Sequence, residues 1–244
     1  MPLPFRSPGN TVTDPRPPLL LLPGFLCDEE LWRDQLTGLA DVAECRVADL
    51  GHGDSIAGLA RQLLATAPPR FALAGFSFGG YVAQEIARQA PQRIERLALL
   101  DTSFHADTPE RIAQRRAANK SVSLPGEFRG MTEQLLPSFV APARLHDAAL
   151  AQRINAMTLR QGRDVFIRQN VMRREDGEAV LRSLTCPVMV LCGRLDVLTP
   201  LALHEAMVAL MPQAQLVVVE DSGHMSPMEQ PAAVTQAMRT WLSA

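Results

Sequence analysis

A serine stands between two glycines at the end of an apolar stretch. Residues 71–80 read FALAGFSFGG, which places Ser77 at the centre of the pattern Gly-x-Ser-x-Gly. An apolar run before this pattern and a helix-like segment after it are typical of a nucleophile elbow, where a strand turns sharply into a helix. The apex is a strained position, and side chains at Gly75 or Gly79 would crowd the neighbouring strand or helix. We therefore expect Ser77 to be a nucleophile exposed above a sheet.

A serine nucleophile needs a general base at neutral pH, and the histidines after Ser77 supply the candidates. His146 and His204 fall in segments with helical patterns. His224 follows the last expected strand in a Gly-His loop, at the same edge of the sheet as Ser77. The sequence therefore predicts that His224 is the base.

The base needs a carboxylate to orient it, and in the elbow arrangement the acid lies between the serine and the histidine along the chain. Asp196 follows the expected strand over residues 188–192 and fits that place. Asp101 follows the preceding strand and is the competing candidate, unless it serves as a turn or helix cap. We expect Asp196 to complete a triad with Ser77 and His224.

The tetrahedral intermediate of acyl transfer carries a negative oxygen, which two backbone N–H groups must bind. One donor follows the nucleophile, which points to Phe78. The other comes from the loop after the first central strand, which points to Phe25 in the turn Pro23-Gly24-Phe25. The same segment would also fit a plain strand-to-helix turn.

The elements that must position these residues alternate along the chain. Apolar runs predict strands over residues 19–22, 45–50, 71–74, 96–100, 188–192 and 216–219. Helical patterns fall between them, and this alternation indicates an α/β fold with a mostly parallel sheet of about six strands flanked by helices. Between residues 105 and 185 helical patterns cover 111–119, 132–136, 145–159 and 163–173. We expect an all-helical lid over 105–185, inserted after the strand that ends near Leu100, and a core of residues 1–104 and 186–244.

Four short segments together resemble the α/β-hydrolase fold superfamily, in particular its serine esterases, from Leu19 to the C-terminus. They are GFSFGG at 75–80, GRLD at 193–196, Gly223-His224 and the turn GHGDS at 51–55. Many relatives have His-Gly where this chain has Pro23-Gly24, and there is little room for the family's two N-terminal strands, so the sheet is expected to be shortened. The resemblance also argues against dehalogenases and epoxide hydrolases, which have Asp at the elbow, and against hydroxynitrile lyases, which have Lys where Met225 stands.

The residues around the elbow predict an apolar pocket without an evident carboxylate clamp. The expected substrate-binding side chains are Leu26, Phe76, Phe139, Met157, Phe166 and Met225. We predict a carboxylesterase of the EC 3.1.1 type, which cleaves an ester of a short or medium, mainly apolar acyl chain through an acyl-enzyme intermediate. No cofactor and no metal are expected.

Three alternatives stay open at this point. One is a lactonase or carbon–carbon bond hydrolase, whose small acidic substrate would be held by Arg153, Arg160, Arg163 or Arg168. The second is a thioesterase. The third is a hydrolase-like ligand receptor with little turnover.

Composition limits the partners. The formal net charge of −2 makes nucleic acid and anionic membranes poor candidates. The proline-rich N-terminus argues against a signal peptide, and no segment is long enough to span a membrane. The four cysteines show no metal-type spacing, which fits free thiols in the cytoplasm. We expect a cytoplasmic monomer or homodimer that acts on a small-molecule ester.

Overall fold

The computed structural model describes residues 16–244, so the expectations for the residues up to 15 lie outside the described residues. In that part of the chain six strands form one sheet, in the order β2-β1-β3-β4-β5-β6. Every pair of neighbouring strands is parallel, which confirms the predicted sheet. The strands are β1 (Pro18–Leu22), β2 (Glu44–Val47), β3 (Phe71–Phe76), β4 (Ile94–Leu100), β5 (Val188–Gly193) and β6 (Ala214–Val219).

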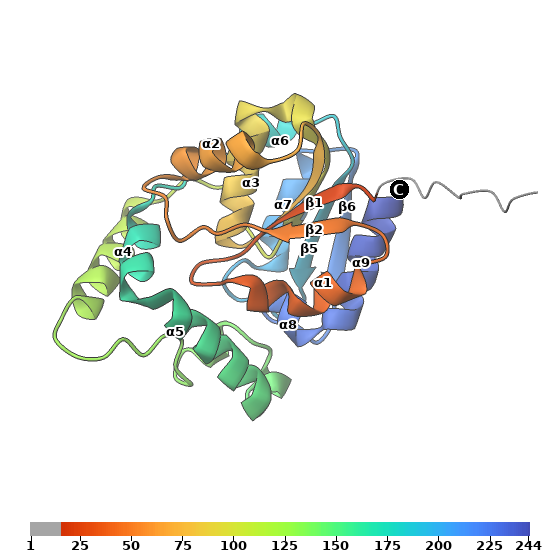
Figure 1. Ribbon diagram of the computed structural model, residues 1–244. Helices are drawn as coiled ribbons and strands as arrows, with labels where there is room; N and C mark the ends of the chain where they lie inside the picture. Colours follow the sequence, from red (N-terminus) through yellow and green to blue (C-terminus); the bar gives the residue numbers. More distant parts are fainter. Residues whose placement is uncertain (1–15) are drawn as a thin grey trace, which may run out of the picture.

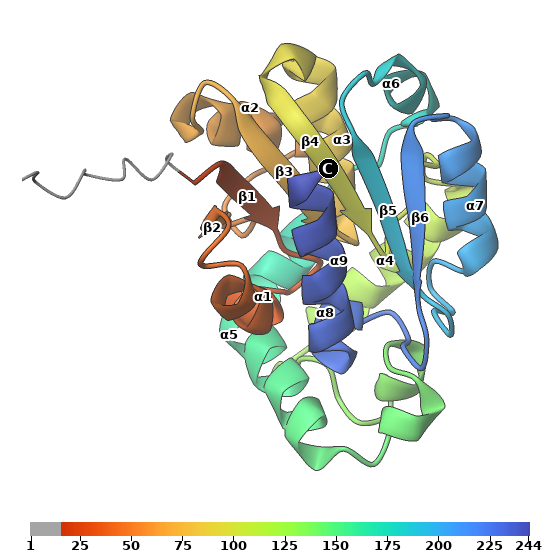
Figure 2. The ribbon, with the colours of Figure 1, turned by 90° about the vertical axis from the view of Figure 1, so that its right-hand side faces the viewer.

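The central strands are apolar along their whole length because both faces of the sheet are covered. All residues of β3 and β5 are buried, as expected for a parallel sheet between two layers of helices. One face packs against α2 (Ile56–Thr66), α3 (Phe78–Gln89), α6 (Glu178–Ser183) and α7 (Leu201–Ala209). The other packs against α1 (Arg33–Gly38), α9 (Pro231–Ser243), the short α8 (Ser226–Glu229) and the 3₁₀ helix η1 (Glu29–Trp32) (Figure 2).

The strand order creates a place for a ligand. The chain leaves β1 toward β2 and then returns to the other side of β1 to form β3. Open α/β sheets bind ligands at the carboxyl ends of the strands at such a switch point. Phe25 follows β1 and Ser77 follows β3, so the topology brings both to this point.

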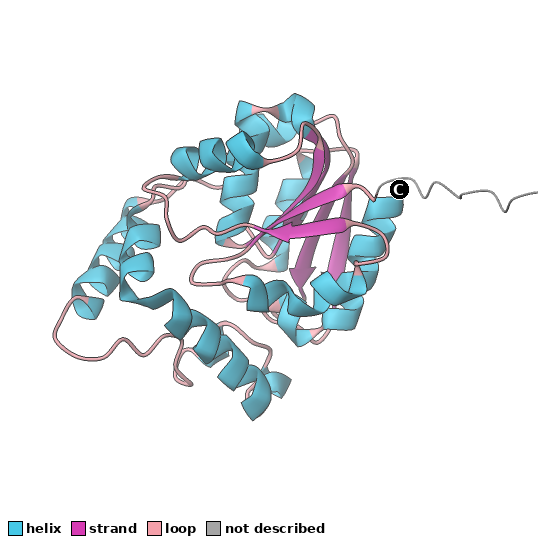
Figure 3. Cartoon of the chain, in the orientation of Figure 1, coloured by secondary structure: helices cyan, strands magenta, loops and turns pink. Residues whose placement is uncertain are grey.

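The chain between β4 and β5 is built from helices, turns and loops (Figure 3). Its two long helices, α4 (Pro109–Val122) and α5 (Ala148–Val171), pack against each other and lie beyond the carboxyl ends of the strands (Figure 1). The short 3₁₀ helices η3 (Leu136–Ser138) and η4 (Pro142–Arg144) lie between α4 and α5 along the chain. Helix α6 comes after α5 and packs against α3.

One local expectation needs correction. The predicted helix over 132–136 is a series of turns that leads into η3, because Pro137 follows directly. The two predicted helices over 145–159 and 163–173 are the two halves of α5, which meet at Gly162, where the backbone is not helical (φ 76°, ψ 177°). Cys186 precedes β5 and Cys192 lies within it; both thiols are free, as are those of Cys27 and Cys45.

In residues 16–244, helices that are long and apolar enough for a membrane span are absent.

Candidate active site

Ser77 lies at the sharp turn between β3 and α3. Its backbone has φ 50° and ψ −112°, a conformation that residues other than glycine rarely adopt. A Cβ atom at Gly75 would lie 2.5 Å from the carbonyl oxygen of Gly79, and one at Gly79 would lie 2.4 Å from that of Leu22. The two glycines therefore allow the close approach of strand and helix that the predicted elbow requires.

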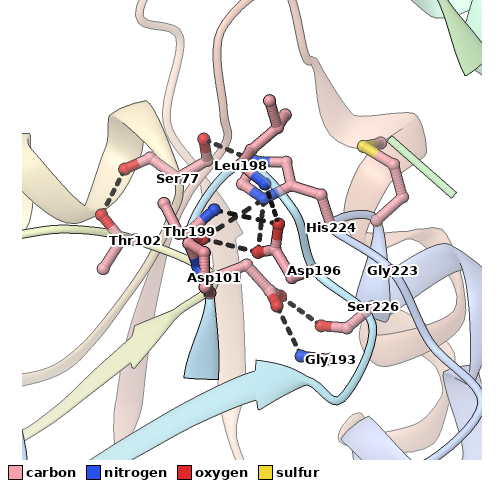
Figure 4. A network of polar contacts seen from close by, with 12 residues as sticks. Ser77, Asp101, Thr102, Gly193, Asp196, Leu198, Thr199, Gly223, His224 and Ser226 are labelled. Atoms are coloured by element: carbon pink, nitrogen blue, oxygen red, sulfur yellow. Dashed lines mark hydrogen bonds and ion pairs between the residues drawn. The ribbon is translucent and has the colours of Figure 1, made fainter. Parts of the chain in front are cut away.

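A chain of hydrogen bonds joins Ser77 to His224 and Asp196 (Figure 4). The Nε2 atom of His224 lies 2.9 Å from Ser77 Oγ, and its Nδ1 atom lies 2.7 Å from Asp196 Oδ2. Because a carboxylate accepts hydrogen bonds, Nδ1 carries the proton and Nε2 is left to accept the proton of the Ser77 hydroxyl. The structure thus brings together the three residues that the sequence predicted.

Asp196 is held as an anion although it is buried. Burial raises the pKa of its carboxyl group, but hydrogen bonds from His224 and Thr199 outweigh burial and lower the pKa below its ordinary value. Oδ1 accepts the backbone N–H groups of Leu198 and Thr199 at 2.8 and 3.0 Å, and Oδ2 accepts the Thr199 hydroxyl. The residue can therefore orient His224 and stabilise its protonated form.

Asp101, the competing acid, has different partners. It accepts the backbone N–H of Gly193 at 2.8 Å and contacts the hydroxyl of Ser226 (Figure 4). It is fully buried, and this burial, together with the nearby charge of Asp196, raises the pKa of Asp101 well above its ordinary range. The carboxyl group ties the ends of β4 and β5 to the start of α8, and does not contact His224 within hydrogen-bond distance.

Two residues behind Ser77 were not predicted to act at the site. The hydroxyl of Thr102 donates to the carbonyl oxygen of Ser77 at 2.6 Å, and the backbone N–H of Thr102 donates to His204 Nε2 at 3.2 Å. Burial lowers the pKa of His204, which keeps the ring neutral and its Nε2 atom free to accept. The helical pattern around His204 indicated its place in α7 but not its partner Thr102, which follows β4 and lies more than a hundred residues earlier in the chain.

The two predicted oxyanion donors lie where the chain leaves β1 and β3. Phe78 is the first residue of α3, so its backbone N–H has no acceptor within the helix. Phe25 and Phe78 both line a cavity that also contains Ser77 and His224. The N–H of the next residue, Leu26, is already engaged by Gln169 Oε1 at 2.9 Å.

The cavity beside Ser77 has a volume of about 450 Å³ and is more polar than expected. Its apolar lining comes from Phe25, Phe78, Phe139 and Leu198. Its polar and charged lining includes Thr102, Ser103, Asp107, Arg111, Gln114, Arg115, Asn170, Arg174 and Thr199. The sequence showed no evident carboxylate clamp, whereas three arginines line this cavity.

Most of the predicted substrate-binding side chains are packed elsewhere. Only Phe139 among the six belongs to the lining of this cavity in the described chain. The Phe76 ring is buried against the ring of His224, 5.3 Å between centroids, and the ring of Phe139 lies 6.1 Å away from His224. Phe166 packs edge-on against Phe25. Leu26, Met157 and Met225 are buried.

The four arginines considered for an acidic substrate are engaged elsewhere. Arg153 pairs with Glu30 and Asp34, and Arg160 pairs with Asp28. The other two donate to backbone carbonyls, Arg163 to Gly126 and Arg168 to Gly51. The cavity takes its arginines from α4 and from the segment after α5 instead.

A parallel α/β sheet that holds a linked serine, histidine and aspartate at its carboxyl edge has the architecture of a serine hydrolase. The model of the alpha/beta hydrolase family matches residues 19–237, and the chain belongs to this family.

The comparisons with individual proteins agree with this assignment. The pimeloyl-[acyl-carrier protein] methyl ester esterase of Vibrio parahaemolyticus is 29% identical, over 85% of this chain and 87% of that protein. A thermophilic esterase from Thermogutta terrifontis is 30% identical, with a TM-score of 0.81 over 94% of this chain and 90% of that one. A hydrolase from Pseudomonas aeruginosa is 28% identical, with a TM-score of 0.82 over 94% and 91%.

Proposed function

We propose that the protein is a carboxylesterase in which Ser77, His224 and Asp196 hydrolyse an ester through an acyl-enzyme intermediate. The observation that carries this proposal is the continuous hydrogen-bonded path from Ser77 Oγ through His224 to Asp196, at distances of 2.9 and 2.7 Å. It supplies a nucleophile, a base and an orienting acid at one point of the sheet edge.

In the first half-reaction Ser77 Oγ attacks the ester carbonyl while His224 Nε2 takes its proton. The backbone N–H groups of Phe25 and Phe78 bind the resulting oxyanion. The carbon–oxygen bond to the alcohol then breaks, and His224 gives its proton to the leaving oxygen. In the second half-reaction water attacks the acyl carbon, His224 takes its proton, and Ser77 recovers it as the acid leaves.

The names of the relatives suggest the kind of ester. The relative from Vibrio parahaemolyticus is called a methyl ester esterase, so we propose that this chain also accepts esters of small alcohols. Residues of α4 line the cavity, and we propose that the segment from α4 to the end of α5 acts as its lid. The four free thiols fit a cytoplasmic location. A monomeric or homodimeric state stays a prediction.

The test is a panel of p-nitrophenyl and methyl esters of increasing acyl length with the wild type and Ser77→Ala. We expect the substitution to lower kcat by about 10⁴–10⁶-fold and to abolish labelling by a fluorophosphonate. Ser243→Ala, at the end of α9, is the control and keeps both ester hydrolysis and labelling by the fluorophosphonate. Unchanged ester turnover in Ser77→Ala would refute the proposal, whereas a labelled wild type that hydrolyses none of the esters would favour a ligand receptor.

A further inference from the structure

Three arginines line the cavity that contains Ser77. Arg111 and Arg115 come from α4, and Arg174 follows the end of α5. In the described part of the chain Asp107 is the only carboxylate in this lining. Asp107 is already occupied, because it pairs with Arg115 and accepts the backbone N–H of Arg174 at 2.9 Å. The charged lining therefore has an excess of positive charge.

Arg174 is buried without a carboxylate partner. It is 7% exposed, and no aspartate or glutamate of residues 16–244 forms an ion pair with its guanidinium. Its Nη1 atom donates to the carbonyl oxygens of Gln169 and Met172, and the guanidinium lies over the Phe78 ring, 5.0 Å from the centroid. Burial and, next, the charge of Arg115 lower the pKa of Arg174 to about 10. A buried cation without a counter-ion is unfavourable, so the site is suited to an anion.

Some other arginines of the same segment have an acidic partner. Arg144, Arg153 and Arg160 each form an ion pair with an aspartate or glutamate. Within residues 16–244 Arg111 forms no such pair, although it is exposed and Glu110 lies in the first turn of its own helix. Arg111 and Arg174 are thus two arginines without an ion-pair partner in the lining of the cavity that contains Ser77.

We propose that Arg111 and Arg174, with Arg115 beside them, form an anion subsite that binds a second, free carboxylate on the acyl part of the ester. The substrate class is then the monoester of a dicarboxylic acid. This inference rests on the proposed esterase function and specifies its substrate. Arg174 packs against the ring of Phe78, so the subsite lies beside the residue whose N–H binds the carbonyl oxygen in the proposed mechanism.

The subsite takes no part in bond making. Ser77 Oγ forms a bond to the ester carbon, and the bond from that carbon to the alcohol oxygen breaks, with His224 moving the proton as before. Water then releases the acid. The second carboxylate is unchanged throughout and holds the acyl chain in place, so the products are a small alcohol and a dicarboxylate. Charge-assisted hydrogen bonds to arginine are the strong kind that can hold such a group.

The test compares two esters with the same acyl length, mono-p-nitrophenyl adipate and p-nitrophenyl hexanoate. In the wild type we expect kcat/KM for the adipate ester to exceed that for the hexanoate ester by about tenfold or more, since ion pairing adds to binding. Arg111→Gln should lower this ratio about tenfold. The matched control is Arg116→Gln, on the same helix but outside the cavity lining, which keeps the wild-type ratio.

Arg174→Gln is a second variant, and its folding is checked by its melting temperature because the side chain is buried. Free adipate should inhibit hexanoate ester hydrolysis by the wild type and inhibit Arg111→Gln about tenfold less well. Inhibition by inorganic phosphate but not by adipate would assign the subsite to phosphate and overturn the carboxylate assignment. If kcat/KM were about the same for the adipate and hexanoate esters, in the wild type and in Arg111→Gln alike, the anion subsite would be overturned while the esterase function would stand. Failure to hydrolyse either ester would instead count against the proposed function.

Discussion

The loops at the edge of the sheet and the helix α4 line one cavity, but they are held in different ways. The sheet edge is buried and cross-linked: Asp196 alone accepts four hydrogen bonds, and Thr102 joins the end of β4 to Ser77 and His204. Helix α4 has no buried residue and packs chiefly against α5. A segment with few buried contacts opens at lower free energy than the core.

The difference follows from what each region must do. Proton transfer and nucleophilic attack require atoms held near fixed positions, and strand ends within a packed sheet provide them. Entry of a substrate requires an element that can move without unfolding the rest. The side chains of the proposed anion subsite on α4 therefore stand on a less stable support than the proposed catalytic residues. The predictions below test this division.

The largest expected effect separates the two buried aspartates of the sheet edge. Asp196→Asn should lower kcat by about 10³–10⁴-fold, because the amide cannot stabilise the correct tautomer and the protonated form of His224. Asp101→Asn should lower kcat less than about tenfold, because Asp101 contacts Gly193 and Ser226 rather than His224. Ester hydrolysis by the two variants measures the difference. A larger loss in Asp101→Asn than in Asp196→Asn would assign the acid to Asp101.

The sheet edge was largely predictable from the sequence because its signals are local. Ser77 follows β3 directly, and Asp196 and His224 lie in the loops after β5 and β6. Parallel strands bring their carboxyl ends to one edge. Asp101 also follows a strand, so the sequence favoured Asp196 by strand order but kept Asp101 as a competitor. That choice depends on how the loops after β5 and β6 bring Asp196, and not Asp101, to His224.

The lining of the cavity was not predictable because it depends on how helices pack. Arg153 and Arg160 lie on α5 and were plausible ligands for an acidic substrate, but α5 packs against η1, where Asp28 and Glu30 neutralise them. Arg111 and Arg115 became part of the cavity through the position of α4 beyond the sheet edge. Met157, expected at the substrate, is instead fully buried. An apolar or charged side of a helix does not by itself reveal which neighbour covers it.

A smaller effect concerns the pH dependence of stability. The pKa of Asp101 is raised well above 3.8 in the folded protein. The folded state therefore keeps a proton that the unfolded state releases above about pH 4. The contribution of Asp101 to stability is fully present below that pH and is lost as the pH rises through the folded-state pKa.

Asp101→Asn removes this titration and keeps a carbonyl oxygen that can accept the N–H of Gly193, while its amide nitrogen replaces the oxygen that accepts the Ser226 hydroxyl. We expect the difference in the free energy of unfolding, variant minus wild type, to increase from pH 4 to pH 8. The increase should be about 1.4 kcal/mol for each pH unit by which the raised pKa of Asp101 extends into that range. Denaturant titrations at several pH values measure it. The pKa of Asp196 is lowered, so the titration of this group lies below the pH range of the comparison. A difference that stays constant over this range would contradict a raised pKa.

The smallest effect comes from two helix caps, one in each region. The Thr108 hydroxyl accepts the backbone N–H of Arg111 at the start of α4, and the Ser55 hydroxyl accepts that of Gly58 at the start of α2. Removing either cap should destabilise its own helix by about 1 kcal/mol. Because α2 is part of the core, Ser55→Ala should lower the free energy of global unfolding by that amount.

Thr108→Ala should leave the free energy of global unfolding unchanged and instead speed amide exchange within α4 about fivefold, since only α4 opens more often. It should also lower the preference for the adipate ester by a few-fold, because Arg111 and Arg115 are then in place for less of the time. The preference should be unchanged in Ser55→Ala. If Thr108→Ala lowered the global stability as much as Ser55→Ala, α4 would unfold together with the sheet, and the two regions would be one cooperative unit.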